Sequence, residues 1–188
     1  MSWISRIGLR IAAGAATVSP SWVAATPPTS ERLPEPSLLL AYATQTGVAE
    51  HYARDTAARL RRAGVGVLLM EFDALTPELL AASPQALLVV STTYDGDPPD
   101  MAQGFCERMG DPAALSALHY GLLSLGDRCY REFCGFGRRL HAWLQISGAH
   151  AGFPPVEVDD EDAAALAEWH RQVDAWLVGG TRQRDVVM

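Results

Sequence analysis

Hydroxyl groups and a glycine directly follow the first strong apolar run of this sequence, in the segment ATQTGVAE at 43–50. The segment then leads into a helical pattern, so backbone N–H groups and the positive end of a helix dipole would face whatever binds there. The hydroxyls of Thr44 and Thr46 add two donors, and Gly47 lets the backbone close around a ligand without a Cβ. The segment predicts a phosphate site held by neutral donors, with an ordinary capped helix start as the alternative.

Two later segments carry carboxylates and aromatic rings. STTYDGDPPD at 91–100 is a turn by its Asp, Gly and Pro content, and it includes Tyr94. LSLGDRCYREF at 123–133 breaks at a glycine and places Tyr130 at the expected start of a helix. A phosphate loop, two polar rims and stacking rings fit a flat heteroaromatic ligand with a single phosphate. No histidine lies near the carboxylates, so no metal is expected.

Apolar runs alternate with helical patterns over the rest of the chain, which is typical of a parallel sheet. Strands are expected at 37–43, 65–71, 86–91, 120–125 and 154–158. Helices are expected at 48–63, after Thr76 as N-cap, from about Asp100, around 133–144, and at 160–177. The predicted fold is α/β, a three-layer doubly wound sandwich around a five-stranded parallel sheet. Ligands bind such sheets beyond the carboxyl ends of the strands, where these loops would meet.

Composition limits the classes of function. The chain has 188 residues, of which 48% are hydrophobic and 20% charged, as expected for one soluble globular domain. A formal net charge of −7 argues against nucleic acid and anionic membranes as partners and suits a basic protein. The three cysteines form no CxxC pair and indicate neither a disulfide framework nor a metal cluster.

Four segments resemble the FMN-contacting segments of flavodoxin-like domains: YATQTGVAE, STTYDGDPPDMA, LSLGDRCYREFCGFGRRL and VDDEDAAALAEW. The resemblance runs from about Leu38 to Leu177 and is above all to the FMN domains of diflavin reductases, of the sulfite reductase flavoprotein and cytochrome P450 reductase type. It implies a flavodoxin-like fold, FMN as the cofactor, and the ribityl phosphate of FMN as the anion at the first loop.

The resemblance also implies which residues contact FMN. Around the phosphate it places Thr44, Gln45, Thr46, Gly47, Val48 and Ala49. On one side of the isoalloxazine it places Thr92, Thr93, Tyr94, Asp95 and Gly96. The other side comprises Leu125, Gly126, Asp127, Tyr130 as the outer stacking ring, Phe133 and Cys134, and Asp159 faces the flavin edge. No catalytic residue is implied.

Two positions depart from the family pattern. Val48 stands where the family usually has a third hydroxyl residue, so its contact with phosphate falls to the backbone N–H. Tyr94 stands where the family has a glycine whose peptide can flip next to the reduced flavin. A positive φ at a residue other than glycine costs about 1–2 kcal/mol, so we expect weaker stabilisation of the partly reduced flavin. Alternatively, Tyr94 stacks on the inner face of the flavin.

The expected organisation is a disordered or leader segment at 1–36, a flavodoxin-like FMN-binding domain at 37–178 and a C-terminal tail at 179–188. A cytoplasmic location is expected. Export or membrane attachment through the first segment is the alternative, because that segment combines two arginines with a weak apolar patch.

The leading functional hypothesis is an electron carrier that shuttles electrons from a separate flavin reductase to an acceptor protein. Acidic residues gather in the predicted loops and favour partners with a basic docking surface: Asp95, Asp97, Asp100, Asp127, Asp159, Asp160, Glu161 and Asp162. No second phosphate loop is present for a nicotinamide. The alternatives are an FMN-dependent quinone or nitro reductase, and a flavin-free flavodoxin-like interaction module.

Overall fold

A computed structural model describes residues 38–109 and 113–184 of the chain, with side chains up to residue 177. The leader predicted for 1–36 and the last four residues of the predicted tail lie outside the described residues. All described residues belong to one compact unit. Within these ranges, no helix combines the length and the apolar character that crossing a bilayer requires.

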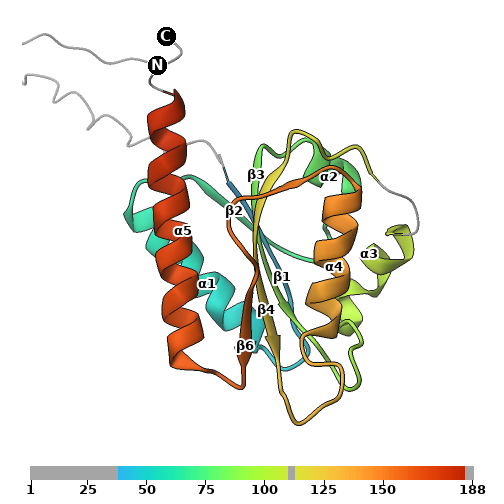
Figure 1. The fold of residues 1–188 in the computed structure, drawn as a ribbon. Coiled ribbons are helices and arrows are strands. Elements are labelled where there is room, and N and C mark those ends of the chain that lie inside the picture. Colours follow the sequence, from blue (N-terminus) through green and yellow to red (C-terminus); the bar gives the residue numbers. More distant parts are fainter. Residues whose placement is uncertain (1–37, 110–112, 185–188) are drawn as a thin grey trace, which may run out of the picture. The chain divides into compact units, whose positions relative to one another are not determined.

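A single parallel sheet forms the centre of the described chain (Figure 1). The strands run in the order β2-β1-β3-β4, and two short strands, β5 and β6, both pair with β4. Their bounds are β1 Leu38–Ala43, β2 Val67–Glu71, β3 Gln85–Ser91, β4 His119–Gly126, β5 His150–Ala151 and β6 Val156–Asp159. Because β1 lies between β2 and β3, the strand order reverses beside β1, and a ligand crevice opens at such a point.

The fifth position of the sheet differs from the sequence prediction of one continuous strand at 154–158. β5 pairs with the start of β4, β6 pairs with its end, and Gly152 and two prolines separate them. Proline lacks the N–H group that a sheet ladder requires, so the chain leaves the sheet between the two strands. β6 continues to Asp159, where its carboxyl end faces Gly126 of β4.

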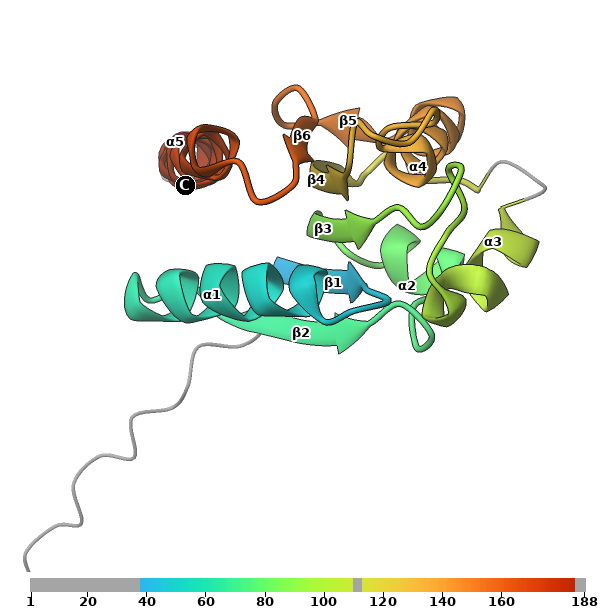
Figure 2. The same ribbon diagram turned by 90° about the horizontal axis from the view of Figure 1, so that it is seen from below.

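Helices cover both faces of the sheet (Figure 2). α1 Val48–Arg62 and α5 Ala163–Arg184 lie on one face, over a buried cluster that includes Leu40, Tyr42 and Trp169. The 3-10 turn η1 Asp100–Ala102 and the helices α2 Pro77–Ala81, α3 Gln103–Arg108 and α4 Gly135–Ile146 lie on the other. Alternate residues of a strand point to opposite faces, so β1, β2, β3 and β4 each contribute to the apolar clusters on both faces. The predicted three-layer α/β sandwich is confirmed.

Most predicted helices have the expected bounds. Thr76 caps α2 as predicted, because its hydroxyl accepts a hydrogen bond from the Leu79 N–H at 3.2 Å. Two predictions were wrong in detail. α4 begins at Gly135, so Tyr130 lies in the turn before it rather than at the helix start. α5 extends to Arg184 instead of ending near Leu177, because paired glycines weaken a helix without ending it.

Candidate functional site

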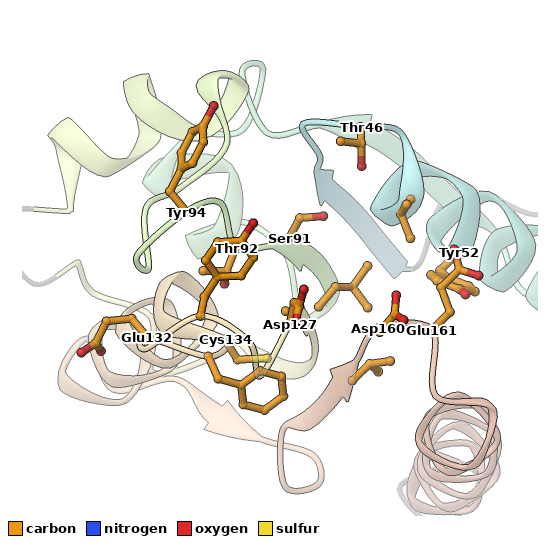
Figure 3. A pocket seen from close by; sticks show the side chains of 16 residues that line it. Thr46, Tyr52, Ser91, Thr92, Tyr94, Asp127, Glu132, Cys134, Asp160 and Glu161 are labelled. Atoms are coloured by element: carbon orange, nitrogen blue, oxygen red, sulfur yellow. The ribbon is translucent and has the colours of Figure 1, made fainter.

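A cavity of about 190 Å³ opens at the carboxyl ends of β3, β4 and β6 (Figure 3). Four segments surround it: the loop after β1 with the start of α1, the loop after β3, the loop after β4, and the loop after β6. The sequence pattern predicted that the loops after the first, third and fourth strands meet here, and the resemblance added the segment after the last strand. The lining residues predicted from sequence are Thr46, Val48, Thr92, Tyr94, Leu125, Gly126, Asp127, Tyr130, Phe133 and Cys134.

Other predicted site residues belong to the same loops without lining the cavity. These are Thr44, Gln45, Gly47, Ala49, Thr93, Asp95, Gly96 and Asp159. Most of them shape the loops through hydrogen bonds or close backbone contacts. Their direct contacts with a cofactor stay predictions.

Several lining residues were missed by the sequence reading of the site. They are Tyr52, Ser91, Glu132 and Val158, whereas Asp160 and Glu161, which also line the cavity, were predicted only as acidic rim residues that favour a basic partner. Tyr52 follows Val48 by one helical turn, so helical spacing could have placed it on the same side of α1. Ser91 is the last residue of β3, so its place at the strand end could have been predicted as well. Asp160 and Glu161 form a turn directly after β6, and the sequence does not reveal toward which side that turn directs them.

The first loop leaves several backbone donors open. Gly47 has φ 94°, and its N–H donates to the Thr44 hydroxyl oxygen at 2.9 Å. The first helical hydrogen bond of α1 runs from the His51 N–H to the Gly47 carbonyl. The N–H groups of residues 48–50 precede it and therefore have no acceptor within the helix. These donors and the exposed Thr46 hydroxyl suit an anion.

The Gln45 side chain is tied to Asp100 within the chain, and its contact with a phosphate stays a prediction. Its side-chain amide donates to the Asp100 carboxylate, and its amide oxygen accepts from the Asp100 N–H, each at 3.1 Å. The Thr44 N–H next to it is directed to the Met101 sulfur, at 3.2 Å. The first loop is thus tied to the beginning of η1, which follows the second loop.

The second loop is a tight turn. The Thr93 N–H donates to the Asp97 carbonyl at 2.8 Å, and the Gly96 and Asp97 N–H groups donate back to the Thr93 carbonyl. Tyr94 lies between them with φ 41° and 77% of its surface exposed. Tyr94 therefore adopts the left-handed backbone conformation, which was expected to be costly at this position. Tyr94 presents its ring at the outer edge of the cavity (Figure 3).

The third loop packs Phe133 and Cys134 inward. Burial raises the pKa of Cys134 to about 11, and its thiol donates to the Ser124 carbonyl at 3.3 Å. The thiol therefore stays protonated and acts as a packing group. Phe133 is buried under the Arg128 guanidinium, whose carbon lies 4.5 Å from the ring centroid. Tyr130 remains half exposed at the mouth, where a stacking ring has access to a ligand.

Asp159 joins the third and fourth loops. Its carboxylate accepts from the Arg128 N–H at 2.9 Å and pairs with the Arg128 guanidinium at 3.3 Å. Asp159 itself does not line the cavity, and its predicted place facing the flavin edge stays a prediction. Asp160 and Glu161 line the cavity instead. Partial burial raises the pKa of Tyr52, and the nearby Glu161 carboxylate raises it further.

Backbone strain is concentrated around the cavity. Among the described residues other than glycine, those with positive φ are Tyr94, Cys134, Asp160 and Glu161, and each of them lines the cavity. Such conformations cost about 1–3 kcal/mol each and persist where the surrounding structure imposes them, most often at functional sites.

The donors fit a ligand that carries hydrogen-bonding groups and a phosphate. The Thr92 hydroxyl is buried, lines the cavity and has no partner within the described chain. A buried hydroxyl without a hydrogen-bond partner is destabilising, so a ligand oxygen or nitrogen that bonds to it would remove this cost. The described lining includes no Lys or Arg, which leaves a phosphate to neutral donors. No three His, Cys, Asp or Glu side chains within 38–109 and 113–184 are grouped to hold a metal.

Comparisons with known proteins agree with this geometry. The flavodoxin family profile matches residues 40–171. The sulfite reductase [NADPH] flavoprotein alpha-component of Shewanella sp. (strain MR-7) is 33% identical over 82% of this chain and 26% of its own length. The protein of that name from Aliivibrio fischeri is 30% identical over 92% of this chain and 28% of its own length. The chain thus spans about a quarter of the length of these relatives.

Solved structures show the same fold. A flavodoxin of Streptococcus pneumoniae TIGR4 superposes with a TM-score of 0.63 at 27% identity, over 73% of this chain and 97% of that one. Flavodoxin 1 of Bacillus cereus superposes with a TM-score of 0.62 at 22% identity, over 73% and 97%. The profile match, the relatives and the open cavity at the strand ends together show that this chain belongs to the flavodoxin family and contains its FMN-binding domain.

Proposed function

We propose that this chain is an FMN-dependent electron carrier, which receives electrons from a separate flavin reductase and delivers them to an acceptor protein. The observation that carries the proposal is the arrangement of the cavity at the carboxyl ends of the strands. Open N–H donors lie at its α1 end, and two tyrosines stand exposed at its mouth, Tyr94 at 77% and Tyr130 at 50%. A flavin anchored by its phosphate would keep its ring near the surface, where a partner protein can approach.

Bound FMN supplies reversible redox chemistry, and the residues of this chain supply binding and access. The amides of residues 48–50 and the Thr46 hydroxyl would hold the phosphate. The Thr92 hydroxyl would bond a polar group of the ligand, and Tyr130 would cover the ring. Val48 adds an apolar contact in place of a hydroxyl.

The charges at the mouth support a basic partner. Asp127, Glu132, Asp160 and Glu161 line the cavity, and a surface of this sign speeds encounter with a positively charged protein. Arg128 is paired with Asp159 and stacked on Phe133, so it offsets this charge only in part. Electron transfer to a basic acceptor should therefore slow as ionic strength rises.

A two-stage assay tests the function. First, purified chain is titrated with FMN, and quenching of flavin fluorescence reports binding. Second, the loaded protein is mixed with NADPH, with or without a flavin reductase of the ferredoxin reductase kind, and reduction of cytochrome c is followed. Reduction that requires both the reductase and the FMN-loaded chain is expected. Direct oxidation of NADPH by the chain alone would indicate a quinone or nitro reductase, and no FMN binding would indicate a flavin-free module.

A further inference from the structure

Gln45 and Asp100 form a two-point contact between segments that lie far apart in the sequence. The Gln45 Nε2 group donates to the Asp100 carboxylate at 3.1 Å, and the Asp100 N–H donates to the Gln45 Oε1 atom at the same distance. The amide of Gln45 is thus used on both of its ends. We name this pair the Gln45–Asp100 contact.

The contact lies at a point where the first loop has little other support. Gln45 and Thr46 are exposed, and the N-cap residue of α1, Gly47, has no side chain with which to cap the helix. A second contact joins the same two segments, because the Thr44 N–H of the first loop is directed to the sulfur of Met101 in η1. The 100–101 segment therefore supports the first loop from outside the cavity, through two successive residues.

The existing hydrogen bonds also favour a positioning role for Gln45 over direct contact with a phosphate. If the Gln45 amide turned toward a phosphate, the Asp100 carboxylate would lose its side-chain donor and its N–H would lose its acceptor. Each lost hydrogen bond reduces the gain from the new contact. A loop already held in its binding geometry also loses less conformational entropy when the ligand arrives.

We propose that Gln45 is a positioning residue, which acts through Asp100 to hold the first loop in the geometry that receives the FMN phosphate. The inference rests on the proposed function, because it assumes that FMN is the ligand. It differs from the role that the resemblance implies, in which Gln45 itself holds the phosphate. In this arrangement the phosphate is held by backbone N–H groups and the Thr46 hydroxyl, and Gln45 fixes where those donors stand.

The test compares the affinities for FMN and riboflavin, which differ by the phosphate alone. Gln45→Met removes the amide at similar length, and Asp100→Ala removes the partner carboxylate. Each is expected to weaken FMN binding by about threefold to tenfold and to leave riboflavin binding unchanged. Gln45→Met removes both hydrogen bonds of the contact, whereas Asp100→Ala removes only the one to the carboxylate, so the double variant should bind FMN about as well as Gln45→Met alone. Asp100→Asn keeps an acceptor oxygen and should restore much of the affinity lost in Asp100→Ala.

Gln103→Met is the matched control, because Gln103 is exposed, lies close to the same segment and makes no side-chain hydrogen bond in the described structure. It should leave both affinities unchanged. Hydrogen exchange of the ligand-free protein gives a second readout: amides of residues 45–49 should exchange faster in Gln45→Met and Asp100→Ala.

Three outcomes would overturn the proposal. Loss of FMN affinity in Gln45→Met, with unchanged affinity in Asp100→Ala and unchanged hydrogen exchange of residues 45–49 in both, would show direct contact with the phosphate. An equal loss of riboflavin affinity would show a general disturbance of the cavity. Unchanged FMN affinity in both variants would show that the contact has no role in binding. If the unmodified chain binds neither flavin, the proposed function itself fails, a result that is separate from all three.

Discussion

Gly96 and Gly135 bring the second and third loops of the cavity into backbone contact, since a Cβ on Gly135 would stand 2.9 Å from the Gly96 Cα. A Cβ on Gly96 would in turn come within 2.8 Å of the Glu132 Cβ. The Arg139 guanidinium donates to the Gly96 carbonyl at 2.7 Å and holds the two loops together. The loops on either side of the cavity mouth are therefore one packed unit.

Gly96→Ala should destabilise the protein by about 1–3 kcal/mol and weaken FMN binding, because Gly96 has φ 103° and no space for a Cβ. Gly104→Ala is the matched control: Gly104 lies in α3 with a single neighbour at 4.0 Å. That change should stabilise by about 0.5–1 kcal/mol. Urea unfolding of both variants measures the difference. Equal stability of the two would contradict the packed contact.

Thr92→Val should separate stability from binding. The change replaces a buried hydroxyl that has no partner in the described chain by a methyl group of similar shape. The flavin-free protein should become as stable or more stable by about 1 kcal/mol. FMN affinity should fall by about tenfold, because the ligand loses a hydrogen bond. Thermal unfolding without flavin and fluorescence titration with FMN measure the two effects. Lower stability without flavin would mean that the hydroxyl has a partner.

Thr56→Val should destabilise the packing of α1 against α5. The buried Trp169 indole N–H donates to the Thr56 hydroxyl at 3.0 Å, and valine would leave that donor unpaired. A cost of about 1–3 kcal/mol is expected in urea unfolding, with FMN affinity unchanged. Thr56→Ser retains the hydroxyl and should lose much less. If serine and valine cost the same, the hydrogen bond is not the reason.

His141 should make the protein less stable in mild acid. Burial lowers the pKa of His141, whose Nδ1 atom lies 2.7 Å from the Tyr120 hydroxyl oxygen. The unfolded chain then binds a proton more readily than the folded one, so stability is full above the unfolded pKa near 6.5 and is lost as pH falls below it. His141→Gln cannot titrate and should flatten the profile between about pH 7 and 5. Parallel profiles for both proteins would refute this assignment.

The sequence by itself was enough to predict the layered fold and the loops that form the cavity. The apolar run that ends at Ala43 predicts a buried strand, and Gly47 predicts the turn into α1. Both predictions were possible because they depend on residues that are neighbours in the sequence. The resemblance added FMN, which the family match confirms. The position of α4 after Tyr130 was missed, since a turn without proline gives little local signal.

Side-chain contacts between residues far apart in the chain could not be predicted from the sequence. The Gln45 amide is directed to Asp100 and the Asp159 carboxylate to Arg128, and the sequence predicted neither pairing. Polar side chains have several possible partners, and which one they reach depends on how loops from different strands are brought together. The sequence thus determined which loops meet at the strand ends. Only the tertiary structure decided which of their side chains line the cavity and which hold the loops in place, because that choice depends on distances between residues far apart in the chain.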